Sequence, residues 1–183
     1  MHISPILHQY VLHERIQMEQ VNEVFPNQYF GPDLPDEEFR PCYYHGKEIP
    51  GYFVSQYGNV KGKQKRRLKW SRRNKTQWYP NINLYLPNAG YLEDFDRANT
   101  EKIRVPVHTL VANSFLPLTN ETVPEALRGY NFDKTALEYI RSLLYIDHID
   151  NDPTNPHVSN LRYVSPKENN PYYKAATYES SAK

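Results

Sequence analysis

Cysteine is almost absent from this sequence, and its scarcity limits what the chain can build. Cys42 is the single cysteine among 183 residues. One cysteine excludes an internal disulfide framework and a zinc site made from paired cysteines, so we expect no structural zinc. We interpret Cys42 either as a small buried hydrophobic side chain or as an inert surface thiol.

Long apolar runs are also missing. No stretch approaches the roughly 18–20 apolar residues of a membrane span. The first residues lack the basic start, the apolar stretch and the small-residue cleavage site of a secretory signal. We therefore expect a protein that binds no membrane, is not secreted and works in the cytoplasm. Seven Gly against fifteen Pro further indicate stiff, irregular connections.

Acidic residues are absent from one long segment. The whole chain has 22 Lys and Arg against 21 Asp and Glu, a net charge of +1, which by itself argues against a polyanionic partner. Residues 49–92, however, hold nine cations and no acid, whereas residues 1–48 carry a net charge of −5 and residues 93–183 a net charge of −3. The total charge therefore conceals a strongly basic segment.

Ordinary protein surfaces mix charges of both signs, so this segment is better explained as a phosphate-binding surface than as a solvated loop. Its arginines could read base edges or only position the backbone of a nucleic acid, and both readings stay open. The nine expected contacts are Lys61, Lys63, Lys65, Arg66, Arg67, Lys69, Arg72, Arg73 and Lys75.

The residue pattern predicts an α+β protein with a small antiparallel sheet ahead of a helix and a strand–loop–strand–helix unit. Residues 49–62 alternate apolar and polar side chains around Tyr57-Gly58-Asn59, which indicates a hairpin. Apolar residues at helical spacing predict helices over 105–117 and 133–144, and a short amphipathic helix over 1–24. The Pro-rich and acidic stretch 25–48 reads as an irregular connector.

The segment over residues 145–170 contains the residues best suited to chemistry. Asp147 and His148 end a predicted strand, and Asn169 lies on the first turns of the helix that follows the returning strand. Carboxylate and amide oxygens suit a hard cation such as Mg²⁺, and a histidine beside them suits the deprotonation of water. Adjacent strand residues point to opposite faces, so the chain must bend at Asp147 for both to serve one site. Taken alone, the same residues could form an ordinary turn.

This segment resembles the HNH nuclease family, whose fold is called ββα-metal, and especially its phage and intron homing endonucleases. Two further stretches carry the resemblance. VHTLVANSFLP, over residues 107–117, resembles the helix that precedes the core in those enzymes, and IPGYFVSQYGNVKG, over residues 49–62, resembles their N-terminal DNA-binding module. Three motifs in the same order are a far more specific signal than any one of them.

The resemblance implies a role for each site residue. His148 would be the general base for water, Asp147 and Asn169 the ligands of one Mg²⁺ or Mn²⁺ ion, and Asn160 the residue that braces the loop and orients the histidine. The implied reaction is hydrolysis of a phosphodiester in double-stranded DNA by an enzyme of phage or mobile-element origin, acting in the host cytosol. One such site cuts one strand, so a monomer would nick. The rival interpretation is a non-catalytic DNA- or RNA-binding protein that retains the fold.

The same resemblance suggests how the chain is divided. We expect an acidic N-terminal extension over 1–48, a basic sheet module over 49–104, a nuclease domain over 105–174 with an insertion at 118–144, and a frayed tail over 175–183. The extension either binds a protein partner or folds onto the basic segment and competes with DNA.

Several other polar residues have simpler explanations. His108 lies on an apolar helix and is interpreted as a packed histidine rather than a ligand. His157 is a solvated loop residue or a DNA contact. Asp150 and Asn155 are interpreted as turn formers, and Asp150 could instead contact a metal-bound water. Trp70 and Trp78 fit a sheet core better than a base-stacking surface.

Overall fold

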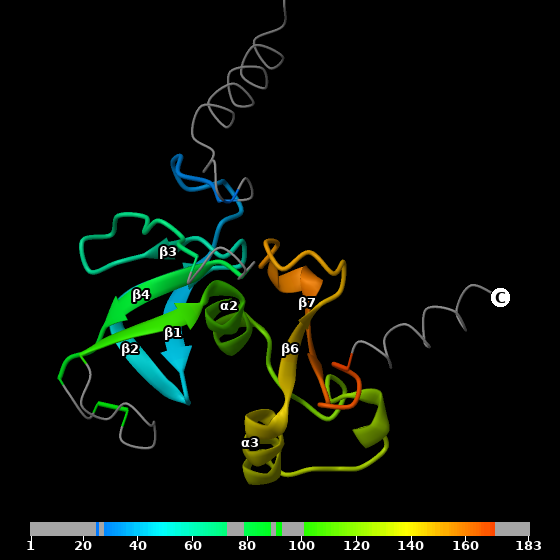
Figure 1. The fold of residues 1–183 in the computed structure, drawn as a ribbon. Coiled ribbons are helices and arrows are strands. Elements are labelled where there is room, and N and C mark those ends of the chain that lie inside the picture. Colours follow the sequence, from blue (N-terminus) through cyan, green and yellow to red (C-terminus); the bar gives the residue numbers. More distant parts are fainter. Residues whose placement is uncertain (1–24, 26–27, 73–78, 89–90, 93–100, 171–183) are drawn as a thin grey trace, which may run out of the picture.

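The chain forms an α+β fold of three small antiparallel sheets around one central helix (Figure 1). The computed structural model describes residues 25, 28–72, 79–88, 91–92 and 101–170. The amphipathic helix expected at 1–24, the tail at 175–183, Arg73, Lys75 and Trp78 all lie outside these residues. Within the described ranges, no helix has both the length and the apolar character needed to cross a bilayer.

The first sheet has the strand order β1-β2-β3, with both neighbouring pairs antiparallel. β2 (Lys47–Ser55) is the central strand, and it turns back into β3 (Val60–Lys61) through the expected hairpin around Tyr57-Gly58-Asn59. β1 (Phe39–Tyr44) forms one edge. The sequence predicted an irregular connector here, and this part of that prediction was wrong.

Gly51 and Gly58 occupy positions that a larger residue would not tolerate. Gly51 has φ +80° inside β2, where the register with β1 shifts, so it forms a bulge. Gly58 has φ +82°, and a Cβ atom there would lie 2.4 Å from Cγ of Pro156. The hairpin turn therefore packs directly against the loop that precedes β7. A backbone bond from Val158 N to Gln56 O, 2.9 Å long, joins the same two segments.

The second sheet leads directly into the central helix. β4 (Asn81–Tyr85) pairs with β5 (Lys102–Pro106), and α2 (Val107–Phe115) begins at the next residue. Val107 N donates to Pro80 O at 2.9 Å, which fixes the first turn of α2 beside the start of β4. α2 confirms the helix predicted over 105–117 except at its ends, since Val105 and Pro106 belong to β5 and the helix ends at Phe115.

The third sheet is the hairpin of β6 (Tyr145–His148) and β7 (Leu161–Val164), joined by a loop that ends in the short 3₁₀ helix η2 (Val158–Asn160). α2 packs against β1, β2 and β5 on one side and against β6, η2 and β7 on the other. Figure 1 shows α2 between the β1–β5 region and this hairpin. The preceding stretch contains η1 (Glu125–Leu127) and α3 (Lys134–Leu143), the second predicted helix.

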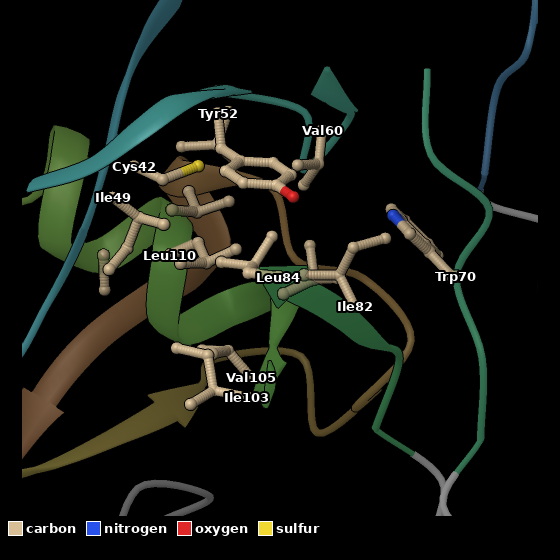
Figure 2. Packing of buried hydrophobic residues seen from close by; sticks show 14 of the residues in the cluster. Cys42, Ile49, Tyr52, Val60, Trp70, Ile82, Leu84, Ile103, Val105 and Leu110 are labelled. Carbon is tan, nitrogen blue, oxygen red and sulfur yellow. The ribbon is translucent and has the colours of Figure 1, made fainter. Parts of the chain in front are cut away.

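The hydrophobic core lies between the first two sheets and α2 (Figure 2). β2 contributes Ile49 and Val54, β4 contributes Leu84, and α2 contributes Leu110, all fully buried. Trp70 is also buried, as the sequence predicted, and its Nε1 donates to Gly58 O at 3.1 Å. Cys42 is buried among these apolar side chains, in agreement with the first of its two interpretations.

Candidate active site

The β6–β7 connection is held by the side-chain amide of Asn160. Asn160 Nδ2 donates to Asp150 Oδ1 at 2.8 Å and to Asn155 O at 2.9 Å, while its Oδ1 accepts from Asp150 N at 3.0 Å. Its backbone O also accepts from Ile149 N, the residue after His148, at 2.8 Å. Asn160 is buried, so this amide fixes the loop on which His148 lies. The geometry fits the bracing role that the resemblance implies for it.

Asp150 and Asn155 form turns within the same loop. Asp150 Oδ1 accepts from Asp152 N at 2.8 Å, and Asp150 Oδ2 accepts from Asn155 Nδ2 at 2.7 Å. Burial alone raises the pKa of Asp150, but the hydrogen bonds from Asn155, Asp152 and Asn160 and the nearby His148 together hold it below its ordinary value. Asp150 is therefore a carboxylate whose charge interacts with that of the nearby His148.

His148 is buried at the end of β6, where its ring meets two other rings. Its centroid lies 4.9 Å from that of His108 with an interplanar angle of 77°, and 5.7 Å from that of Tyr79. Tyr79 and His108 are themselves 5.0 Å apart. Tyr79 immediately precedes Pro80 and β4, and His108 is the second residue of α2. The close pairing of the starts of β4 and α2 thus places both rings against β6.

The surroundings of His108 differ in one respect from those expected from the sequence. The histidine is packed, as expected, but its neighbours include the proposed general base as well as the apolar core. Burial lowers the pKa of His108 to about 3, with a further contribution from the positive charge that His148 can carry. No local pattern indicates this contact, because 40 residues separate the two histidines.

Asp147 points to a different neighbour. It pairs across the hairpin with Arg162, whose Nε and Nη2 donate to Asp147 Oδ2 at 3.1 Å and 2.9 Å. Asp147 is 6% exposed, whereas Arg162 is half exposed. Adjacent strand residues alternate here, since Asp147 meets Arg162 while His148 meets α2. The bend at Asp147 that one shared site requires is not present in β6, so Asp147 would have to turn from Arg162 to serve the same site as His148.

Asn169 lies in the turn that follows β7. Ser165 and Glu168 form a reciprocal capping arrangement there, with Ser165 N donating to Glu168 Oε2 at 2.7 Å and Glu168 N donating to Ser165 Oγ at 3.3 Å. Asn169 N donates to Ser165 O at 3.0 Å, which is the bond of a first helical turn. Residues 166–169 form a turn, and the rest of the segment predicted to be a helix lies outside the described residues.

The donors of Asp147 and Asn169 suit a hard divalent cation. Across the described residues, no group of three or more His, Cys, Asp or Glu is gathered to hold a metal. A carboxylate with one amide is the smaller donor set that Mg²⁺ accepts when it keeps several waters. Asp147 already binds a cation, the Arg162 guanidinium, and because Arg162 is half exposed it can turn toward solvent. The chemistry of these two donors therefore suits such an ion, and its binding would require Arg162 to move aside or to share the carboxylate of Asp147.

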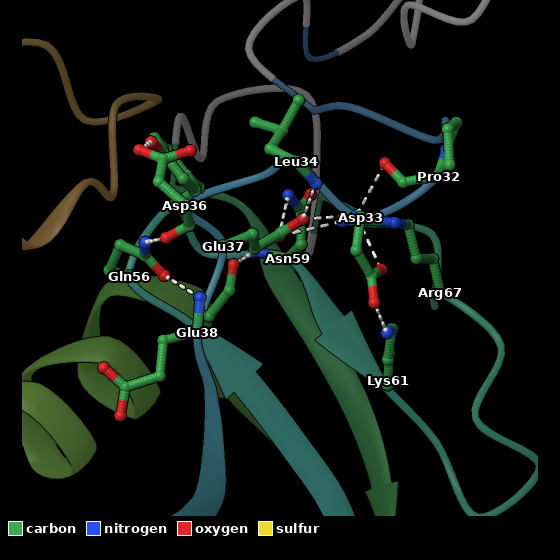
Figure 3. Close-up of polar contacts among 12 residues, drawn as sticks. Pro32, Asp33, Leu34, Asp36, Glu37, Glu38, Gln56, Asn59, Lys61 and Arg67 are labelled. Atoms are coloured by element: carbon green, nitrogen blue, oxygen red, sulfur yellow. Dashed lines mark hydrogen bonds and ion pairs between the residues drawn. The ribbon is translucent and has the colours of Figure 1, made fainter.

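The nine cations of the basic segment do not all have the same environment. Lys61 pairs with Asp33 at 2.5 Å, and Arg67 pairs with Asp33 at 3.2 Å and with Glu37 at 2.5 Å (Figure 3). Burial raises the pKa of Glu37, but hydrogen bonds from Arg67, Asn59, Ser55 and the Leu34 backbone lower it more. The pKa of Glu37 is therefore below its ordinary value. Two of the expected phosphate contacts are thus bound to acids of the N-terminal stretch.

Four other cations of the segment are exposed and form no ion pair with any residue in the described ranges. Arg72 is half-buried, with its guanidinium 5.3 Å from the centre of the Phe25 ring. The four exposed cations are Lys63, Lys65, Arg66 and Lys69. They lie on the turn after β3 and on the strand-like stretch that follows it, and we call them the exposed basic cluster.

No family model matches the sequence, and no curated protein matches it. Among solved structures, the chain is similar to one titled "DNA binding and cleavage by the HNH homing endonuclease I-HmuI". The two are 23% identical with a TM-score of 0.43, over 79% of this chain and 59% of the other, so the chain spans less than two thirds of that protein's length.

Proposed function

We propose that this chain is a divalent-metal-dependent HNH endonuclease that hydrolyses a phosphodiester bond in DNA. One observation carries the proposal: a buried histidine ends β6, an asparagine amide fixes its loop, and a second asparagine lies in the turn after β7. The resemblance gives His148, Asn160 and Asn169 these positions, and the order strand, loop, strand and turn supports the proposal.

His148 would act as the general base in this reaction. The oxygen of a water molecule bonds to phosphorus while the bond from phosphorus to the 3′ oxygen breaks. The water proton passes to His148, and the 3′ oxygen takes a proton from solvent. The imidazolium formed on His148 lies near the carboxylate of Asp150, which stabilises it.

Asp147 and Asn169 would hold the metal, which when bound supplies Lewis-acid stabilisation of the phosphate and the leaving oxygen. Asn160 would keep the loop, and with it His148, in one position. The exposed basic cluster would bind phosphates of the duplex on either side of the scissile bond. We further propose that the product is a nick, because one site of this kind cuts one strand, and that the enzyme is of phage or mobile-element origin.

The ion pair between Asp147 and Arg162 favours a second candidate, a DNA- or RNA-binding protein that retains the fold without cleavage. In that protein, Arg162 would satisfy the buried carboxylate permanently. The arrangement around His148 would then serve packing alone.

Incubation with supercoiled plasmid and either Mg²⁺ or Mn²⁺ separates the two candidates. We expect the wild-type protein to produce the nicked form and the His148→Ala variant to lose at least about a hundredfold in rate, the contribution typical of a general base. DNA binding should be unchanged in this variant. His45→Ala, an exposed histidine in the β1–β2 turn, is the matched control and should nick normally. Binding by the wild type without nicking in either metal would favour the non-catalytic candidate.

A further inference from the structure

His108 occupies an unusual position for a buried histidine. Its neighbours along α2, Val107, Leu110 and Val111, are fully buried apolar residues of the core. His108 itself is 9% exposed, and its ring lies edge-on to His148 and against Tyr79. Tyr79 is 41% exposed, so this group of three rings reaches from the first turn of α2 to the protein surface.

The Nδ1 atom of His108 is buried, and it has no hydrogen-bond partner in the described part of the chain. A buried polar atom left unsatisfied costs folding free energy, so it usually marks a bound water or ligand. A phenylalanine would fill the same space without this cost. Packing alone therefore does not account for an imidazole at this position.

Charge gives further support. His148 faces His108 from β6, and Tyr79 faces it from the segment before β4. Burial and the proximity of His148 keep His108 uncharged, with a pKa of about 3. A neutral imidazole donates one hydrogen bond from one nitrogen and accepts one at the other, so Nδ1 can bond a water in either role.

We propose that His108 is a positioning residue for hydrolysis: its Nδ1 hydrogen-bonds the water molecule that His148 deprotonates. This inference rests on the proposed function. The two rings are in contact, with centroids 4.9 Å apart, so the water would lie at their edge, on the side of Tyr79. His108 gains and loses no proton in the step, since the water oxygen bonds to phosphorus, the water proton passes to His148, and the bond to the 3′ oxygen breaks. Its contribution is to hold the water in line for attack.

Three variants separate this role from packing. His108→Phe keeps a ring and removes both nitrogens. His108→Asn removes the ring, but its side-chain amide places a polar atom two bonds from Cβ, as Nδ1 is in histidine. Val111→Ala is the control, because it removes buried apolar volume from the same helix away from His148. Each variant is measured for plasmid nicking as kcat and KM separately, and for thermal unfolding.

We expect His108→Phe to unfold at or above the wild-type temperature, to keep its KM, and to lose roughly ten- to a hundredfold in kcat. His108→Asn should recover most of that loss, whereas Val111→Ala should lower the unfolding temperature and leave kcat unchanged. Wild-type kcat in His108→Phe, or an equal loss in His108→Asn, would show that the ring alone matters and would overturn the proposal. A markedly lower unfolding temperature for His108→Phe would also overturn it, because Nδ1 would then already be satisfied within the fold.

The outcome also distinguishes failure of this inference from failure of the proposed function. If the wild type does not nick and His148→Ala behaves like it, the nuclease assignment fails and the role of His108 fails with it. If the wild type nicks, His148→Ala does not, and His108→Phe equals the wild type, the nuclease assignment holds and this inference alone is overturned.

Discussion

Asn160 shows at the scale of one residue why an amide is needed at the centre of the candidate site. Its Nδ2 donates to a carboxylate and to a backbone carbonyl, while its Oδ1 accepts from a backbone N–H. An aspartate has the same shape but cannot donate to Asp150 Oδ1, and its charge would repel that carboxylate. An alanine would leave all three partners without their bonds. Only an asparagine satisfies both kinds of partner in so small a space.

We therefore expect Asn160→Ala to lower the free energy of unfolding by about 1–3 kcal/mol, the usual cost of leaving buried polar groups unsatisfied. Asn160→Asp should cost more than Asn160→Ala. Urea unfolding followed by circular dichroism measures both. Asn131→Ala, which removes an exposed amide bonded to Asn120, is the control and should change the free energy by no more than about 0.5 kcal/mol. A loss equally small in Asn160→Ala would contradict the bracing role.

At the scale of elements, the acidic segment, defined here as residues 32–38, lies beside the basic segment that begins at β3. Glu37 has a fully buried side chain and pairs with Arg67 and Asn59, so it belongs to the fold. Asp33 is 48% exposed and pairs with Lys61 and Arg67. Exposed ion pairs add little to stability, but the carboxylate neutralises cations that a phosphate could bind. The two acids therefore have different consequences although they lie four residues apart.

We predict that Asp33→Asn binds duplex DNA more tightly than the wild type, by roughly three- to tenfold at low salt, because Lys61 becomes available to phosphate while Arg67 stays paired with Glu37. Fluorescence anisotropy with a labelled duplex gives the affinity. Glu138→Gln is the control, since it makes the same charge change on the exposed side of α3. The difference between the two variants should shrink as salt is raised. Equal affinities at low salt would show that the acidic segment does not compete with DNA.

The same scale shows which elements a sequence can predict. α2 and α3 were predicted because their apolar spacing is local, and the β2–β3 hairpin because Tyr57-Gly58-Asn59 marks a turn. β1 was missed because only Cys42 of its six residues is buried and because Pro41 is typical of an edge strand or a connector. Its strand conformation depends on pairing with β2, which no local pattern reveals.

At the scale of the whole molecule, what the sequence could not give is contact between distant segments. His108 was correctly interpreted as packed, but its contact with His148 depends on how β5, α2 and β6 come together. Lys61 and Arg67 were grouped with their neighbours by charge, and their pairing with Asp33 and Glu37 depends on the return of residues 32–38 to β3. The site residues of 147–169 could be named because strand, loop and turn follow one another along the chain.

The whole-molecule charge distribution leads to the last prediction. A chain of net charge +1 binds a polyanion only if its cations gather on one face. We propose that the exposed basic cluster is that face, and each phosphate contact contributes about 0.9 to the slope of log Kd against log salt concentration. Replacing Lys63, Lys65 and Arg66 together by Gln should therefore lower the slope by about 2–3 and weaken binding at low salt. The decrease in slope and in affinity should be the same for DNA of any sequence, because phosphate contacts do not read bases.

The control for this prediction is a second triple variant, Lys102→Gln, Arg128→Gln and Lys134→Gln, which removes three exposed cations that lie outside the basic segment. Both triple variants have the same net charge, so a general charge effect would change their slopes equally. We expect the slope of the control to stay within about 0.5 of the wild type, since its cations release no counterions from bound DNA. Equal slopes for the two variants would mean that the total charge, and not its location in the exposed basic cluster, governs DNA binding.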